Sequence, residues 1–390
     1  MPPLAINDFT QTRKPPRLSH IHLFLFFACA LFAATLVATL IAGLWPFKSP
    51  ANDAHWVSGE NGIQFTEYGT ALSTGVLDMG EVDACAMEVH LKPAEIWTTG
   101  TPIAFYDRAH ERKFTLQQDY DDLLLRLAKG ERGRFVSERS LRVQNVFRKP
   151  EFLLTVTSDG QKTTVYVDGQ LVLTSPNFVL SAKYLEGRVI LGNAPGRNNS
   201  WGGKIDELAI YPSELTPEQA LQHWQRWKQS GQPVIDSSDK PAALYLFHEH
   251  SGSVIHSVSG SGPELVIPDK FTTVDQTRFE SVASELSAHD SFIENGLINV
   301  AGFMPLGFVG ALFFGCLWCR KIAAIAAILL GAATSVTIEY FQSYLPTRYS
   351  GTTDMITNIL GTCLGVILYC VVAGFIPEKI RIELSRTQSG

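Results

Sequence analysis

Residues 152–175, FLLTVTSDGQKTTVYVDGQLVLTS, contain three short runs of alternating apolar residues. Two Asp-Gly pairs, at 159–160 and 168–169, separate these runs. An Asp-Gly pair between alternating runs indicates a β-hairpin, because both turn residues readily adopt positive φ. Two such turns in succession predict an antiparallel meander. Further short strands of this kind predict an antiparallel sandwich.

One helix is expected after these strands, in LTPEQALQHWQRW (215–227). Thr216 suits the N-cap, Pro217 suits the first helical position, and Glu218 favours the first turn. The polar region around both features spans roughly residues 50 to 290 and holds nearly all of the carboxylates. We therefore expect a large β-rich domain there.

The composition argues against several classes of protein. The net charge of −6, with no basic arm or stripe, argues against a nucleic-acid partner. Five of the six cysteines lie in apolar runs, and Cys85 is alone in the polar region. No disulfide framework follows from this distribution.

Four apolar runs are long enough to cross a bilayer, which takes about 20 residues. They cover residues 23–45, 297–318, 322–342 and 354–376. The first run lacks an A-x-A cleavage pattern, so we expect an uncleaved anchor. The predicted order is a tail (1–22), the first span, a jelly-roll domain (50–230), a connecting segment (231–290), a three-helix membrane domain (291–376) and a tail (377–390).

The basic residues predict the orientation of these spans. They precede the first span, join the second to the third, and follow the fourth: Arg13, Lys14, Arg17, Arg320, Lys321, Lys379, Arg381 and Arg386. With four spans these places share one side, and the positive-inside rule assigns it to the cytoplasm. Both termini are then expected in the cytoplasm and the β-rich domain outside it.

Polar residues interrupt the apolar runs near the expected outer surface. Glu339 and Gln342 share one helix face, and Asp354 and Asn358 share a face of the next helix. Helices joined by so short a loop must be neighbours, so these side chains should converge. The predicted cluster consists of Asn299, Glu339, Gln342, Arg348, Asp354 and Asn358.

The sequence alone leaves three possible roles for this cluster. It either ties helices together, through a Glu339–Arg348 ion pair and a Gln342–Asn358 hydrogen bond, or holds an anionic lipid-linked headgroup. A third reading gives Glu339 and Asp354 a role in catalysis.

The second half of the polar region resembles a known family. GRVILGNAPGRNNSWGGKIDELAIYPSELTPEQALQHW (187–224) is similar to the closing stretch of laminin-G-like, concanavalin A-like jelly rolls. The resemblance implies a binding module, often for glycans and sometimes with calcium. ALYLFHEHSGSVIHSVSGSGPELVIPD (243–269) is similar to the opening strand of such domains. It either completes the same sandwich or is a remnant of a second one.

Two sets of side chains are candidates for a site in this domain. An aromatic platform with polar groups is typical of sugar sites, and one loop region offers Arg197, Asn198, Asn199, Trp201 and Asp206. The alternative is that Trp201 packs under the sheet and Asp206 caps a turn. Calcium needs oxygen ligands, which Asp119, Asp121 and Asp122 could supply, but they lack any metal-loop spacing and an ordinary solvated turn is the preferred interpretation.

The C-terminal region resembles the VanZ-like membrane family. The matching residues are NVAGFMPLGF (299–308), IEYFQ (338–342), Arg348, and the spacing of Asp354, Asn358 and Gly361. The family usually carries paired Asp before its last span, whereas this chain has only Asp354 there. The resemblance implies a context, tolerance of the glycopeptide antibiotic teicoplanin, rather than a reaction.

Together these features predict a mixed fold, an all-β jelly-roll sandwich joined to a four-span helical bundle. We expect a non-enzymatic, multi-pass protein of the bacterial cytoplasmic membrane that binds an envelope glycan or glycoconjugate. One alternative is a membrane enzyme acting on a lipid-linked phosphate or glycan headgroup. Another is an adhesin-like binder with the helices as an anchor. No cofactor is expected unless the jelly roll binds calcium.

Overall fold

The computed structural model describes residues 20–107, 113–127, 139–196, 198–230, 239–259, 261–274, 279, 282, 292–348 and 350–374. Arg197, the basic residues of both tails and most of 275–291 lie outside this description. The chain divides into two compact units. The helical unit comprises Met1–Trp45, Phe279–Gln342 and Ser350–Gly390, and the β unit comprises Pro46–Arg278 and Ser343–Tyr349.

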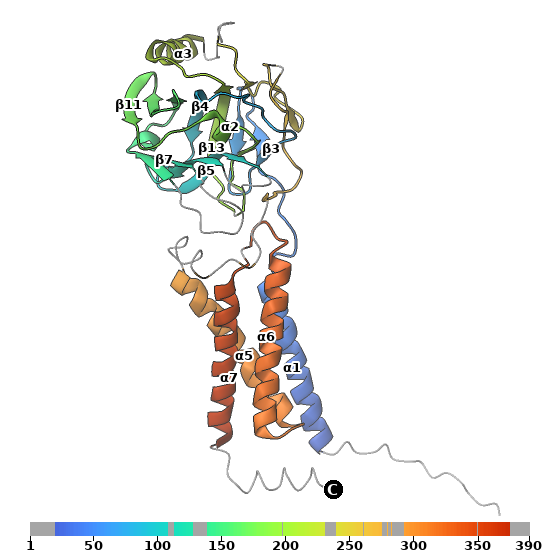
Figure 1. Ribbon diagram of the computed structural model, residues 1–390. Coiled ribbons are helices and arrows are strands. Elements are labelled where there is room, and N and C mark those ends of the chain that lie inside the picture. Colours follow the sequence, from blue (N-terminus) through green and yellow to red (C-terminus); the bar gives the residue numbers. More distant parts are fainter. Residues whose placement is uncertain are drawn as a thin grey trace, which may run out of the picture. The chain divides into compact units, whose positions relative to one another are not determined.

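The β unit is a sandwich of two antiparallel sheets (Figure 1). The first sheet has the order β1-β2-β13-β4-β9-β10-β11, and β14 also pairs with β13. The second sheet has the order β15-β16-β3-β12-β5-β6-β7-β8. The strands of the first sheet are β1 (His55–Trp56), β2 (Ile63–Phe65), β4 (Cys85–Pro93), β9 (Phe152–Ser158), β10 (Thr163–Val167), β11 (Gln170–Ser175), β13 (Gly203–Tyr211) and β14 (Ala243–Tyr245). Those of the second are β3 (Ala71–Ser73), β5 (Thr99–Tyr106), β6 (Phe114–Asp119), β7 (Asp122–Leu127), β8 (Arg139–Val143), β12 (Arg188–Leu191), β15 (Val254–Ile255) and β16 (Leu265–Val266).

The expected meander is present. β9 pairs with β10, and β10 pairs with β11, both antiparallel. Asp168 and Gly169 have φ of 55° and 71°, the left-handed conformation that a two-residue hairpin turn requires. A Cβ at Gly169 would also collide with the backbone of the helix above it. The sequence-based prediction of this hairpin is therefore confirmed.

Residues 243–266 add strands to both sheets. β14 pairs with β13 in the first sheet, and β16 pairs with β3 in the second. Of the two readings of this segment, the structure favours completion of one sandwich over a remnant of a second.

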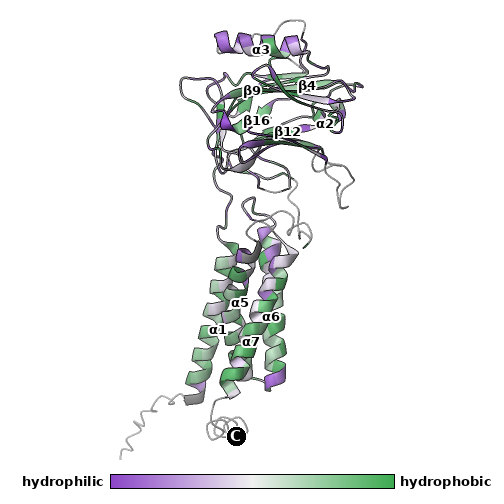
Figure 2. Cartoon of the chain, turned by 90° about the vertical axis from the view of Figure 1, so that its left-hand side faces the viewer, coloured by the Kyte–Doolittle hydropathy of each residue, from purple (hydrophilic) through white to green (hydrophobic). Residues whose placement is uncertain are grey.

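A single core fills the space between the sheets. On β4 the side chains of Met87, Val89 and Leu91 point into that core, as the two-residue period of a strand dictates. Glu88 and His90 point to the opposite face, and the long helix α3 (Pro217–Ser230) lies over this face (Figure 2). The first sheet is thus covered on both faces.

Helix α3 begins with the predicted cap. The Thr216 hydroxyl accepts a hydrogen bond from the Gln219 N–H at 3.3 Å, and the Gln219 side chain accepts one from the Thr216 N–H at 3.0 Å. This reciprocal pair is a capping box. Two shorter elements complete the sandwich, the α2 turn (Ala182–Leu185) and the 3₁₀ turn η1 (Val146–Arg148).

Among the described residues of the helical unit, four long helices run side by side, and apolar residues dominate them (Figures 1 and 2). They are α1 (His20–Leu44), α5 (Phe292–Gly315), α6 (Arg320–Gln342) and α7 (Thr352–Gly374). All four are long and apolar enough to cross a membrane. The mixed fold expected from the sequence is confirmed.

Glycines set the spacing between α5 and α7. A Cβ at Gly361 would collide with the carbonyl of Val300, and one at Gly365 would collide with that of Met304. The two helices therefore pack backbone to backbone along the G-x-x-x-G sequence of α7, the arrangement that small residues permit in membranes.

Candidate functional site

Glu339 lies inside the helical unit, and 1% of its surface is exposed. Its Oε2 atom accepts a hydrogen bond from the backbone N–H of Gly351 at 3.0 Å. Gly351 directly precedes α7, where unpaired N–H groups and the helix dipole favour a negative charge. Glu339 on α6 therefore supplies the anion at the start of α7.

The other polar side chains of this unit also join pairs of helices. Asn299 of α5 donates to Asp354 of α7 at 2.7 Å, and Asn358 of α7 donates to Ser335 of α6 at 3.1 Å. Gln342 of α6 donates to a main-chain carbonyl of α1, that of Gly43, at 2.7 Å. The expected Gln342–Asn358 hydrogen bond is thus wrong, because each side chain is committed to another helix.

Arg348 lies in the 343–349 loop, which belongs to the β unit. There, a hydrogen bond to Glu67 and burial raise the pKa of Tyr68, and the charge of Arg348 opposes that rise. The expected ion pair between Glu339 and Arg348 stays a prediction.

Two buried oxygens of the helical unit lack a hydrogen-bond partner among the described residues: Asn358 Oδ1 and Ser350 Oγ. An unsatisfied polar atom of this kind costs about 1–3 kcal/mol. Both atoms could accept a hydrogen bond from a water molecule or a ligand hydroxyl. An anionic group would be repelled by the carboxylate of Glu339, which already lies at the start of α7.

The aromatic residue of the loop region predicted to bind sugars, Trp201, points into the core. Trp201 is fully buried, and its Nε1 donates to Oε1 of Gln118 at 2.7 Å. Asn199 donates to Thr101 at 2.8 Å, and Asn198 accepts from the hydroxyl of Ser200 at 2.6 Å. Trp201 therefore cannot offer a ring face to a sugar. The aromatic role predicted for Trp201 is therefore wrong, and the alternative interpretation of Trp201 as a packed residue holds. Asn198 and Asn199 are partly exposed, and their role in binding stays a prediction.

Asp206 does not cap a turn. Its carboxylate contacts Lys204 and His90 on β13 and β4, at 3.0 and 2.9 Å. It belongs to a group of charged side chains on the face of the first sheet that α3 covers.

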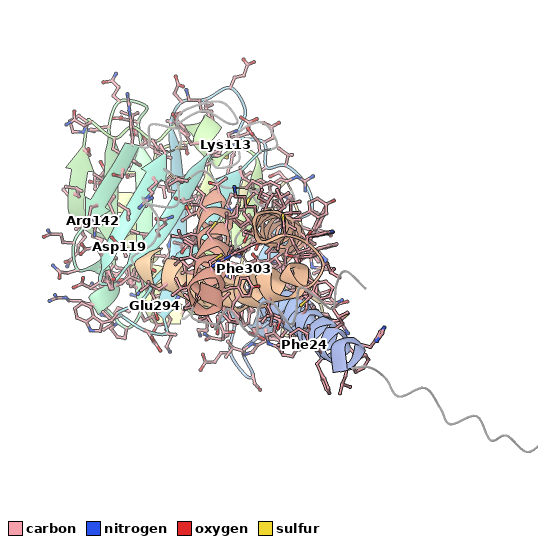
Figure 3. All side chains as sticks on the ribbon, turned by 90° about the horizontal axis from the view of Figure 1, so that it is seen from below. Phe24, Lys113, Asp119, Arg142, Glu294 and Phe303 are labelled. Carbon is pink, nitrogen blue, oxygen red and sulfur yellow. The ribbon has the colours of Figure 1, made fainter. Side chains whose placement is uncertain are left out.

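The three aspartates considered for calcium are paired with arginines. Arg142 of β8 contacts both Asp119 and Asp122, and Arg148 contacts Asp121 at 2.7 Å. Figure 3 labels Asp119 and Arg142 at this edge of the second sheet. Guanidinium groups occupy the place that a calcium ion would need, so the structure does not support calcium at these aspartates. The hydrogen bond from the Asn145 N–H, together with Arg142, holds the pKa of Asp122 below its usual range.

An exposed aromatic pair lies beside these ion pairs. Trp97 in the β4–β5 loop is 73% exposed, and Tyr120 in the β6–β7 turn is 46% exposed. Their ring centroids are 6.5 Å apart, with planes tilted by 53°. Tyr120 has a φ of 58°, and its N–H donates to the carbonyl of Thr98 at 3.0 Å. We call Trp97 and Tyr120 the aromatic platform.

Buried side chains hold this platform in place. The Nε2 of Gln118 lies within 3.2 Å of the carbonyls of Glu95, Ile96 and Tyr120. Gln118 is itself held by Trp201, which donates to its Oε1. Trp201 thus contributes indirectly, because it orients the amide that joins the two loops carrying the platform.

Trp97 and Tyr120 were not among the site residues predicted from the sequence. The available signal was weak: Trp97 stands shortly after Pro93 in one loop, and Tyr120 stands between two aspartates in a tight turn. A loop residue has no periodicity that reveals the direction of its side chain. Only the pairing of β5 with β6 brings the two loops together.

A buried histidine joins α3 to the first sheet. His223 contacts Glu88 at 2.7 Å through Nδ1 and Asp239 at 3.1 Å through Nε2. Burial disfavours its charged form, but the hydrogen bond to Glu88 and the charges of Glu88 and Asp239 outweigh this and raise the pKa of His223 to about 8. Burial, and then the charge of Glu88, raise the pKa of Glu207 on the same face to about 8.

Comparison with known families divides the chain in two. Residues 241–373 match the VanZ/LLP1 family model, and residues 65–220 match that of the concanavalin A-like lectin/glucanases superfamily. None of the curated proteins matches this chain.

Several solved structures are similar to part of the chain. A putative carbohydrate binding protein from Bacteroides ovatus ATCC 8483 aligns with a TM-score of 0.37 and 15% identity, over 58% of this chain and 62% of that chain. The botulinum neurotoxin type G receptor binding domain aligns with a TM-score of 0.35 and 11% identity, over 47% and 46%. The CBM40 of the Ruminococcus gnavus IT-sialidase, bound to alpha2,3 sialyllactose, aligns with a TM-score of 0.31 and 13% identity, over 42% and 96%. The chain spans less than two thirds of the length of the first two structures.

Proposed function

Because this chain joins a VanZ-like helical bundle to a concanavalin A-like sandwich, we propose that it is a multi-pass envelope protein that binds a glycan or glycoconjugate. The four apolar helices make it a membrane protein. We further propose that the membrane is the bacterial cytoplasmic membrane. The basic residues next to the spans then favour cytoplasmic termini and a sandwich on the outer side.

The aromatic platform is the observation that carries this proposal. A sugar ring presents C–H groups on one face and hydroxyls at its edge, so it needs a flat apolar surface with polar groups beside it. The rings of Trp97 and Tyr120 offer that surface. The ion pairs of Arg142 with Asp119 and Asp122 lie beside Tyr120 and can exchange hydrogen bonds with hydroxyls.

The rigid support of the platform also favours binding. A surface aromatic residue loses conformational entropy when a ligand fixes it, and this loss reduces affinity. Here the backbone carbonyls on both sides of the platform are already held by the buried amide of Gln118. The site is therefore ordered before a ligand binds, and binding loses little further conformational entropy.

A glycan array tests the proposal with the full chain in lipid nanodiscs. We expect binding to at least one bacterial envelope glycan, lost in Trp97→Ala. Leu171→Ala is the matched control, because Leu171 is an exposed apolar residue of β11, outside the platform. If no glycan binds, or if the two variants bind alike, the proposal is wrong.

For the helical unit we propose a structural role. Glu339, Asn299, Asn358 and Gln342 each link two segments of the bundle, and the carboxylate already fills the start of α7. Glutamine at 339 should then weaken the bundle without altering glycan binding. A change in glycopeptide susceptibility from Glu339→Gln in a protein of unchanged stability would instead favour a headgroup site or catalysis.

A further inference from the structure

His90 lies on the outer face of the first sheet among groups that can ligate a metal. Its strand, β4, runs between β13 and β9. Asp206 comes from β13, and Glu151 directly precedes β9, so three neighbouring strands contribute one side chain each. One ligand atom from each of the three residues lies within 4.8 Å of the other two.

The backbone is shaped around Asp206. The register of β13 against β4 shifts between Ile205 and Glu207, so Asp206 is the extra residue of a β-bulge. A bulge redirects a side chain that would otherwise follow the alternation of the strand. Gly62, at a φ of 114°, packs so closely on Asp206 Oδ1 that any Cβ there would collide with it.

His90 presents a buried nitrogen without a partner. The side chain is 0% exposed, and its Nδ1 lies 2.9 Å from Asp206 Oδ2. With the proton on Nδ1, this carboxylate fixes the ring and leaves a lone pair on Nε2. That Nε2 has no hydrogen-bond partner among the described residues, and it faces Oε1 of Glu151 at 3.5 Å. A lone pair buried opposite a carboxylate is unfavourable unless a cation lies between them.

We propose that His90 and Glu151 bind a divalent cation of the zinc class, with Asp206 as the positioning residue. Two donors bound about 2.1 Å from one tetrahedral zinc ion lie about 3.4 Å apart, which is close to the observed Nε2–Oε1 separation. Imidazole with carboxylate is a donor set that suits zinc. A carboxylate on the second ring nitrogen is the usual way in which a metal-binding histidine is held.

The surroundings are compatible with a dication. Lys204 lies 3.0 Å from Asp206 and 2.8 Å from Glu60, so one ammonium is shared between two carboxylates and the local charge stays negative. The ring of Trp227 on α3 covers His90, with ring centroids 3.8 Å apart. The Glu151 side chain is 39% exposed, which gives an ion a route from solvent and leaves room for water ligands.

A doubly protonated His90 would also satisfy both carboxylates, so the test must separate a metal from a proton. Full-length protein in nanodiscs, stripped with a chelator, would be titrated with Zn²⁺ alone by calorimetry. Co²⁺, which absorbs in the visible range when bound, would report the ligand geometry. We expect saturable binding of one ion per chain and a higher unfolding temperature in the presence of Zn²⁺.

Variants identify the ligands. His90→Gln and Glu151→Gln should each weaken Zn²⁺ binding at least tenfold. Glu151 is partly exposed, so its variant keeps the test valid if His90→Gln fails to fold. His256→Gln is the matched control, because His256 also lies between two glutamates but is 63% exposed. Absence of saturable binding, or equal loss in His256→Gln and Glu151→Gln, would overturn the proposal and leave the protonated histidine.

Discussion

The contact between α3 and the first sheet should weaken as pH rises, and His223→Gln should remove much of that dependence. The pKa of His223 is raised to about 8 in the folded chain from an ordinary value of 6.5. Burial alone would lower this pKa, but the contacts with Glu88 and Asp239 outweigh it. Because a tenfold change in acidity is worth about 1.4 kcal/mol, this rise contributes about 2 kcal/mol to the stability of the sandwich. The contribution is fully present below pH 6.5 and is lost as pH rises through 8.

Glu207 should act in the same direction. Its pKa is raised to about 8, so the folded chain holds a proton that the unfolded chain loses near pH 4.5. Stability therefore falls with rising pH between these values. The charge of His223 lowers the pKa of Glu207, so comparison of wild type with His223→Gln measures the histidine together with its effect on this carboxyl.

Urea unfolding of the full chain in nanodiscs, followed by tryptophan fluorescence at pH 6 and pH 9, measures this contribution. Trp224 and Trp227 on α3 report the release of the helix. Wild type should lose about 2 kcal/mol more between the two pH values than His223→Gln does. His256→Gln, which changes an exposed histidine, should behave like wild type. Equal losses in wild type and His223→Gln, or a rise in wild-type stability with pH, would show that the charge on His223 does not stabilise the folded chain.

Three further changes test other parts of the structure. Gly361→Val should push α7 away from α5 and lower the stability of the bundle by about 1–3 kcal/mol, measured by thermal melting. Gly302→Ala is the control: a Cβ there meets nothing within 4 Å, so this variant should melt like wild type. Glu339→Gln should lower the free energy of unfolding by about 1–3 kcal/mol in the same melting experiment, because the charge at the start of α7 is lost. Unchanged stability would show that this charge does not stabilise the bundle. Trp201→Phe should weaken glycan binding by freeing the amide beneath the platform while circular dichroism stays the same, and a variant that binds like wild type would show that the platform needs no such support.

Local signals in the sequence predicted much of this fold. The Asp168-Gly169 turn has positive φ at both residues, and the residues around Thr216 define a helix start without help from the rest of the chain. The four spans follow from length and apolarity alone. Such features depend on a few neighbouring residues, which the sequence shows directly.

The sites depend on contacts between distant residues, which the sequence does not show. Trp201 resembled a surface aromatic residue because it stands in a polar, glycine-rich loop, yet its indole reaches Gln118, far away in the chain. Asp119 and Asp122 resembled free oxygen ligands, but the pairing of β7 with β8 brings Arg142 onto them. An arginine from a neighbouring strand neutralises these aspartates, so the short acidic motif does not form the metal site that it suggested.

A hydrogen-exchange footprint shows directly whether the aromatic platform is the glycan site. The full chain in nanodiscs would be measured with and without a saturating glycan chosen from the array. We expect slower exchange in the β4–β5 loop around Trp97 and in the β6–β7 turn around Tyr120, with no change in the loop that precedes β13. Protection confined to any other surface of the sandwich, with these two loops unaffected, would contradict this expectation.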